Sequence, residues 1–206
     1  GTTLTLSYLA NANGNTTVVV TATETTTNPV LSVSDTFTVT VNAINDTPTI
    51  ATAIPDVSVD EDASSTIIDL ANVFTDIESN TLSLSVQSNN TDLVAAVIDG
   101  TTLKLSYLEN ANGNTTVVVT AIETSTNPVL SVTDTFAVTV NAVNDAPMNI
   151  TLSALNINEN NQLGDDVGTL SATDVDTSSF TYTLGTTKDE SNFTISNDIL
   201  KANAIF

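Results

Sequence analysis

The chain has 206 residues, 24 of them acidic and only three basic, so its formal net charge is −21. It contains no Cys, His, Trp or Arg, which excludes disulfides, thiolate zinc sites and catalysis by Cys or His. A surface this acidic repels phosphate, so we expect neither nucleic acid nor an anionic membrane as a partner, whereas divalent cations are favoured. Apolar residues form 40% of the chain, which predicts a folded protein, and no apolar run approaches the roughly 18 residues of a membrane span.

The sequence repeats itself with a period of 99 residues. Residues 1–48 and 100–147 differ at only eight of 48 positions, which is typical of a recently duplicated array. A period of this length suits a β-sandwich domain better than a helical repeat. We therefore expect residues 1–48 to be the C-terminal half of a repeat, residues 49–147 a complete repeat, and residues 148–206 the N-terminal part of a further domain. The parent polypeptide is then expected to be longer.

Within the complete repeat, apolar and polar residues alternate, as they do along half-buried strands. Residues 102–106 and 135–140 both follow this pattern. Residues 117–119 are three consecutive valines, which predict a strand buried on both faces. Threonine fills many of the outward positions, where its β-branched side chain suits the pleat.

Turn residues separate the predicted strands. Asn112-Gly113 and Asn127-Pro128 each predict a turn, and Pro147 marks the end of the repeat. A single helical turn is expected within residues 69–74. About seven strands result, so we predict an all-β chain of tandem, immunoglobulin-like, Greek-key β-sandwiches.

Short motifs at the ends of the repeats resemble the junctions between cadherin domains. Residues 140–147 read VNAVNDAP and are followed by INEN at residues 157–160. Residues 41–48 read VNAINDTP and are followed by VSVDEDA at residues 57–63, which is also similar to the tandem repeats of giant bacterial adhesins. Residues 168–176, GTLSATDVD, are similar to the cadherin segment that carries an Asp-x-Asp pair. The resemblance implies cadherin-like sandwiches along the whole chain.

The resemblance also implies Ca²⁺ at each junction, bound by oxygen ligands from both neighbouring domains. At the first junction it assigns Asn45 and Asp46 of the linker. The acidic pair is represented there by Asp76 and Glu78, and a further acid of the same domain by Glu123.

At the second junction the resemblance assigns Glu61 as the early glutamate of the complete repeat, and Asn144 and Asp145 as the linker ligands. Asp174 and Asp176 match the Asp-x-Asp pair of the next domain. Two acids one residue apart on a loop repel each other unless a cation lies between them, which favours the same assignment.

Some features depart from the cadherin pattern. Glu24 and Glu159 match the acidic positions but would serve junctions outside this chain. Ala43 and Ala142 replace the leading Asp of the linker motif, and residues 108–110 are a poor match to the Leu-Asp-Arg-Glu motif. One or two calcium ions per junction, or none at some junctions, are therefore all consistent with the sequence.

Other interpretations of the same residues remain open. The Asn-Asp-x-Pro sequence of the linkers is also typical of turns that bind no metal, because Asn and Asp favour turns and Pro ends strands. Paired carboxylates also occur in glycoside hydrolases, but here the pairs lie at domain junctions and the chain has no Trp. We therefore expect no enzyme activity.

The sequence and the resemblance together predict calcium-rigidified stalk repeats of a large, secreted, extracellular adhesin. Such a stalk would act at the cell surface in adhesion or biofilm formation, and a gliding-motility filament is a special case. Its expected partners are calcium, the neighbouring repeats, and a homophilic or surface ligand at a distal tip. The alternatives are a homophilic or ligand-binding cadherin-like module, or a non-catalytic accessory region of a secreted polysaccharide-degrading enzyme.

Overall fold

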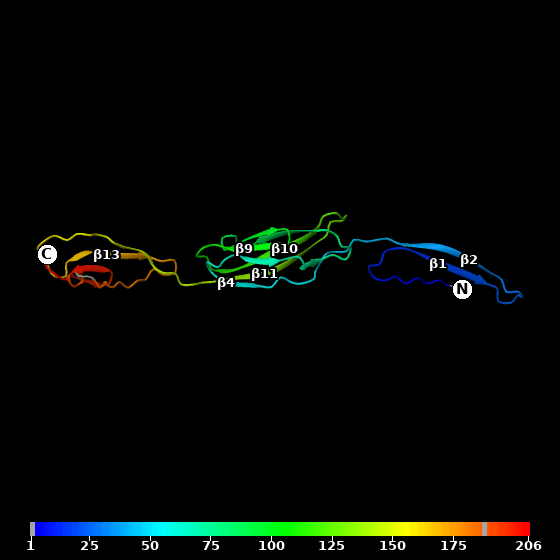
Figure 1. Cartoon of the computed structure of the whole chain (residues 1–206), viewed down its shortest axis with the longest axis horizontal. Helices are drawn as coiled ribbons and strands as arrows, with labels where there is room; N and C mark the ends of the chain where they lie inside the picture. The colour runs from blue at the N-terminus through cyan, green and yellow to red at the C-terminus, as the bar shows by residue number, and fades with distance from the viewer. Residues whose placement is uncertain (1–2, 187–188) are drawn as a thin grey trace.

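The computed structural model describes residues 3–186 and 189–206, and its regular structure is almost entirely β-strand. The strands form three units that follow one another along the long axis of the molecule (Figure 1). The N-terminal unit contains a two-stranded hairpin, the central unit is a sandwich, and the C-terminal unit is one four-stranded sheet. The predicted all-β class is confirmed. Within the described residues, no helix is long and apolar enough to cross a bilayer.

The central unit, whose strands run from residue 49 to residue 141, is an immunoglobulin-like sandwich with Greek-key connections. Its strands are β3 (Thr49–Ile50), β4 (Val57–Asp60), β5 (Thr66–Asp69), β6 (Phe74–Thr75), β7 (Leu82–Ser88), β8 (Val94–Asp99), β9 (Thr102–Tyr107), β10 (Gly113–Glu123) and β11 (Ser131–Asn141). One sheet has the order β4-β11-β10-β7, the other has the order β5-β9-β8, and β3 pairs with β6. The central strands β10 and β11 are antiparallel, whereas β4 runs parallel to β11.

The seven strands expected from the sequence become nine pieces because two of them are interrupted. The first strand consists of β3, which pairs with β6, and β4, which joins β11 in the other sheet. The second strand is broken between β5 and β6, where a turn covers residues 71–73. The single turn predicted within residues 69–74 is present but does not continue into a helix: the Val73 N–H donates to the Leu70 carbonyl at 3.2 Å. The Asp69 carboxylate caps this turn by accepting a hydrogen bond from the Ala71 N–H at 2.9 Å.

The core of the central unit lies between the two sheets, and Phe136 is its largest member. Leu103 and Leu105 of β9 meet Val117 and Val119 of β10 there, all four with no exposed surface, as the alternating pattern predicts. Val118 is different, because it is half-buried on the outer face of its sheet. The predicted burial of the valine run on both faces is thus wrong, since only one face of a sandwich sheet packs on the core.

The N-terminal unit repeats the hairpin of β10 and β11 without the rest of the sandwich. Its strands are β1 (Gly14–Thr23) and β2 (Ser32–Val41). Their register is that of the central unit, since Val18 pairs with Phe37 as Val117 pairs with Phe136. Phe37 is 40% exposed and Phe136 only 2%, because the described N-terminal residues place no second sheet over β1 and β2.

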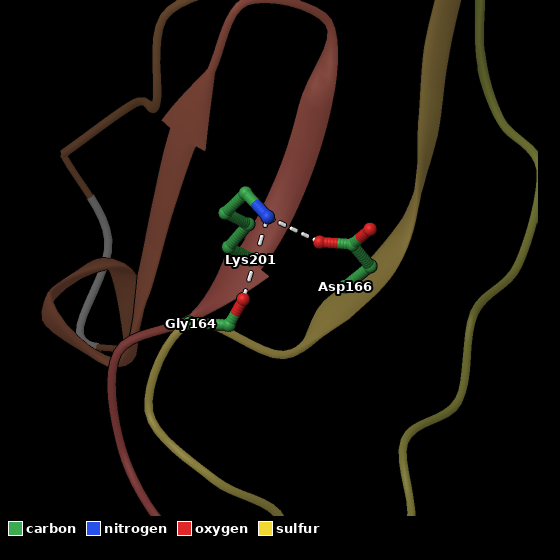
Figure 2. A network of polar contacts seen from close by, with 3 residues as sticks. All are labelled: Gly164, Asp166 and Lys201. Atoms are coloured by element: carbon green, nitrogen blue, oxygen red, sulfur yellow. Dashed lines mark hydrogen bonds and ion pairs between the residues drawn. The ribbon is translucent and has the colours of Figure 1, made fainter.

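The C-terminal unit is a sheet with the order β12-β13-β15-β14. Its strands are β12 (Met148–Leu152), β13 (Asp166–Thr173), β14 (Phe193–Ser196) and β15 (Ile199–Ala202). Asp166 and Lys201 are opposite each other on β13 and β15 and form a salt bridge, and the Lys201 ammonium also donates to the Gly164 carbonyl at 3.4 Å (Figure 2). This cross-strand ion pair joins the two inner strands of the sheet at one end of their ladder.

Candidate cation sites at the junctions

The first junction is held by the amide of Asn45, which lies in the linker between β2 and β3. Its Nδ2 donates to Glu123 Oε2 at 2.7 Å and contacts the Pro128 carbonyl at 3.4 Å. Its Oδ1 accepts a hydrogen bond from Asn80 Nδ2 at 2.9 Å. The linker is therefore attached to the end of β10 and to the loop after β6 at once.

Glu123 ends β10 and is only 1% exposed, although it is acidic. Its Oε2 accepts hydrogen bonds from Thr126 Oγ1, from Asn45 and from the Leu130 N–H. Burial raises the pKa of this carboxyl, but hydrogen bonds from Thr126, Asn45, Leu130 and the Asp76 carboxyl outweigh it and hold the pKa below its usual value. Glu123 is thus charged at neutral pH, and its Oε1 has no hydrogen-bond partner.

The acidic pair Asp76 and Glu78 lies beside the linker. Asp76 Oδ1 accepts the Asn80 N–H at 3.0 Å, while its Oδ2 is buried without a partner. Glu78 Oε2 accepts the backbone N–H of Asp46 at 3.1 Å, and the carboxylate of Asp46 is exposed. The structure therefore brings all five sequence-predicted residues of this junction together, with the side chain of Asp46 at its rim.

Two carboxylate oxygens of the first junction are consequently buried and unsatisfied: Glu123 Oε1 and Asp76 Oδ2. A buried, charged oxygen without a donor costs free energy, and a hard cation is the partner that removes this cost. Amide and carboxylate oxygens are the ligands that Ca²⁺ prefers. The residues of the first junction thus fit calcium in donor type.

At the second junction, Glu61 holds the linker from the preceding unit. This side chain is only 6% exposed. Its Oε1 accepts the Val143 N–H at 2.6 Å and its Oε2 accepts Asn112 Nδ2 at 3.2 Å. The early glutamate therefore orients the linker that carries Asn144 and Asp145.

Asp145 connects this linker to the acidic pair of the C-terminal unit. Its backbone N–H donates to Asp176 Oδ2 at 2.7 Å, which repeats the contact between Asp46 and Glu78 at the first junction. Asp174 Oδ1 accepts the N–H groups of Asp176 and Thr177, so this loop is fixed by its own first acid. Asp145 Oδ2 is buried and has no hydrogen-bond partner.

The charges around Asp145 are all negative. Burial raises the pKa of Asp145, and Asp176, Asp62, Glu61 and Asp174 raise it further by repulsion. Asp62 was missed in the sequence interpretation, although its position in the run Asp-Glu-Asp next to Glu61 is the signal that could have identified it. Its Oδ1 accepts the backbone N–H of residue 110 at 3.0 Å.

The three remaining predicted residues make no described contact with a neighbouring unit. Asn144 is placed in the linker, but its Nδ2 donates to the carbonyl of Asp145 at 2.9 Å rather than to a neighbouring unit. Glu159 lines a polar cavity of about 820 Å³ within the C-terminal unit, together with residues 156–161 and 164–166. Glu24 binds Thr27 and the N–H of Leu31, the same contacts that Glu123 makes with its own loop.

The carboxylates are close to one another without forming a ready-made cage. Within residues 3–186 and 189–206, no three acidic side chains converge on one metal position. A cation at the first junction would therefore be held by Glu123 and Asp76 together with neutral oxygen ligands. A third carboxylate could join them only after small side-chain rotations.

Comparison with known proteins supports the fold. No protein-family model matches the chain, and no curated protein matches it. Among solved structures it is similar to a protocadherin gammaB7 EC3–6 cis-dimer structure, with 22% identity, a TM-score of 0.53, and coverage of 93% of this chain and 50% of the other. It is also similar to protocadherin gamma B2 extracellular cadherin domains 1–5, with 17% identity, a TM-score of 0.53, and coverage of 92% and 38%. The chain thus has a cadherin-like fold and spans half or less of the length of these structures.

Proposed function

We propose that this chain is a section of a tandem array of cadherin-like repeats in a large bacterial adhesin at the cell surface. The near-identity of residues 1–48 and 100–147 supports an array, because duplication of a unit preserves length and stiffness. In this proposal the units meet at residues 48/49 and 147/148, the segment is extracellular, and it has no catalytic role. Its acids serve as linker contacts and cation ligands.

We further propose that calcium rigidifies the junctions. The observation that carries this is the pair of buried, unsatisfied oxygens, Glu123 Oε1 and Asp76 Oδ2, beside a linker already attached through Asn45. Extracellular sites of this kind have affinities of about 10⁻⁴ to 10⁻³ M. At about 10 mM calcium, one site then stabilises the bound state by roughly 1.4 to 2.7 kcal/mol, which is enough to fix a short linker.

At the second junction, calcium would reduce the repulsion between Asp145 and the acids around it. Asp145 lies among four other acids, and its Oδ2 has no donor. A divalent cation neutralises this charge and provides the missing partner. Without the ion, the linker is a hinge under repulsion. With it, consecutive units become a rod that holds an adhesive tip away from the cell.

The test is calcium-dependent shape and melting of the 206-residue chain. Small-angle scattering should show a longer maximum dimension in ~10 mM calcium than in chelator, and the melting temperature should be higher in calcium. This concentration is well above the expected dissociation constant. Glu123→Gln with Asp76→Asn should remove the response of the first junction. Asp99→Asn, an exposed acid at the end of β8, is the matched control. Unchanged shape and melting in calcium and chelator would refute rigidification.

One observation favours a second candidate, a homophilic module. The outer face of β7, β10 and β11 carries no charged side chain, because Glu123 and Asp134 are the only acids of these strands and both are buried. Elsewhere a second copy of a chain with charge −21 would be repelled. Self-association in calcium should then be lost on introducing Thr135→Asp and kept on introducing Ile67→Asp, which lies on the other sheet. A monomer at all concentrations in sedimentation velocity would exclude this candidate.

A further inference from the structure

Side-chain hydrogen bonds, in addition to the backbone ladder, join the first strand of the central unit (its β4 part) to the last strand, β11. β4 and β11 pair in parallel over only four positions, from Val57 opposite Val138 to Asp60 opposite Asn141. Side-chain hydrogen bonds extend this contact at both ends. We call the whole contact, residues 54–61 with residues 134–143, the β4–β11 clamp.

The upstream end of the clamp is made by two aspartates that cross between the strands in opposite directions. Asp134 of β11 is 8% exposed and its Oδ2 accepts the N–H of Ile54 at 2.7 Å. Asp56 Oδ1 in turn accepts the N–H of Ala137 at 2.7 Å. A carboxylate acceptor makes each of these bonds stronger than a bond between neutral groups.

The downstream end is closed by Asn141 and Glu61. The Nδ2 of Asn141 donates to Asp60 Oδ1 at 3.2 Å, and its carbonyl accepts the N–H of Glu61 at 2.9 Å. The Glu61 carboxylate then binds the N–H of Val143 at 2.6 Å. Hydrogen bonds between the two segments therefore continue from the approach to β4 into the linker of the second junction.

The geometry decides how a load would reach these bonds. The neighbouring units lie at opposite ends of the central unit, so tension enters before β3 and leaves after β11 (Figure 1). Because β4 and β11 are parallel, pulling the start of one against the end of the other slides them past each other. All bonds of the clamp are then strained together, whereas strands pulled apart from one end break their bonds in sequence. The β3–β6 pair, with two positions, is the only other ladder that holds the first strand within the described residues.

We propose that the β4–β11 clamp is the force-bearing element of the repeat, and that Asp56 and Asp134 are its reinforcing residues. The inference rests on the proposed function in one respect, namely that a stalk is loaded along its axis.

The test is force spectroscopy on the whole chain tethered at its two ends. Unfolding of the central unit releases roughly 300 Å of chain, which identifies the event. At a fixed force, Asp134→Ala should unfold about tenfold faster and Asp56→Ala about threefold faster, because each loses an acceptor of the clamp. Asp99→Ala, which removes an exposed acid from β8, should leave the rate unchanged.

The direction of pulling separates a force-bearing role from a general loss of stability. The chain has no Cys, so Thr101→Cys and Ala146→Cys give unique handles that leave β4 outside the loaded path. Along this axis both substitutions should change the unfolding rate much less than along the end-to-end axis. Equal acceleration along both axes, or none end to end, would overturn the proposal. Repeating the end-to-end experiment in chelator separates this proposal from that of calcium rigidification. The effects of the two substitutions on the unfolding rate should remain in chelator even if calcium does not bind at the junctions.

Discussion

Asn45 and Glu123 are 78 positions apart in the sequence, yet Asn45 Nδ2 donates to Glu123 Oε2 at 2.7 Å. The bond joins the linker to the last residue of β10 and fixes one carboxylate oxygen, while the other oxygen stays buried and free of donors. One neutral side chain thus both attaches the linker and orients the acid next to it. At the second junction the described contact of the Asn144 side chain lies within its own linker.

This difference predicts unequal effects of the two linker asparagines. Asn45→Ala removes the donor to Glu123 and the acceptor for Asn80, and should cost about 1 to 2 kcal/mol of the stability of the central unit. That corresponds to a fall in melting temperature of roughly 5 to 15 °C for a unit of this size. Asn144→Ala should change it by less than about 3 °C. Equal effects in calorimetry would contradict the assignment.

The acid stability of the first junction should depend on Glu123. Its folded-state pKa is below the ordinary value of 4.5, so its contribution to stability is present above pH 4.5 and is lost as the pH falls through the lowered pKa. Melting curves in chelator between pH 3 and pH 6 should therefore show a loss of stability at the acid end. Glu123→Gln should flatten that part of the profile. A variant that keeps the full acid dependence would contradict this role.

The ionisation of Asp145 should change the stability with pH in the opposite direction to that of Glu123. Its folded-state pKa is above the ordinary value of 3.8, because of burial and then of the surrounding acids. The protonated form is therefore favoured by folding, and stability from this group falls as the pH rises through the raised pKa. In chelator at neutral pH, Asp145→Asn should stabilise the second junction. In calcium the same variant should bind the ion more weakly, as titration calorimetry would show, and stronger binding would contradict its role as a ligand.

Asp62 provides a separate check of the second junction. Its charge acts on Asp145 from the preceding unit. Asp62→Asn should weaken calcium binding by roughly three- to tenfold, because one carboxylate of the ligand set loses its charge. Glu109→Gln is a matched loss of one charge nearby in the sequence and should have a smaller effect. If Glu109→Gln weakened calcium binding more than Asp62→Asn did, Asp62 would not be part of the calcium site.

The two copies of one leucine make the clearest test of the fold. Leu103 has no exposed surface, so Leu103→Ala should cost about 2 to 5 kcal/mol. Leu4 occupies the same position in the N-terminal copy and is 58% exposed, so Leu4→Ala should cost less than about 0.5 kcal/mol. Both are measured by chemical denaturation of the whole chain. A large effect of Leu4→Ala would show that its environment resembles that of Leu103.

Much of the central unit could be predicted from the sequence, because alternation reports directly which face of a strand is buried. Leu103, Leu105 and Phe136 were identified in this way and are in the core. The turn predicted at Asn112-Gly113 lies instead at residues 109–110, because Gly113 is already the first residue of β10. The turn between β5 and β6 falls within residues 69–74 as predicted, whereas the Asp69 carboxylate that caps it was not identified.

The candidate site was predicted in its residues but not in its contacts. Motif positions identified Glu123 and Asp76, whereas burial of one free oxygen on each is a result of how the linker folds against them. Asp62 was missed although it follows Glu61 directly in the run Asp-Glu-Asp. The bonds of Asp56 and Asp134 across the clamp also could not be predicted, because they join segments about 80 residues apart.

The sequence by itself determined the repeat, the alternation and the position of the acids at the junctions. Only the tertiary structure decided which of these segments become strands. Residues 102–107 and residues 3–8 differ at a single position, yet the first segment is strand β9 and the second is not a strand. The physical reason is that β9 has hydrogen-bond partners on both sides, β5 and β8, and a strand exists only through such partners.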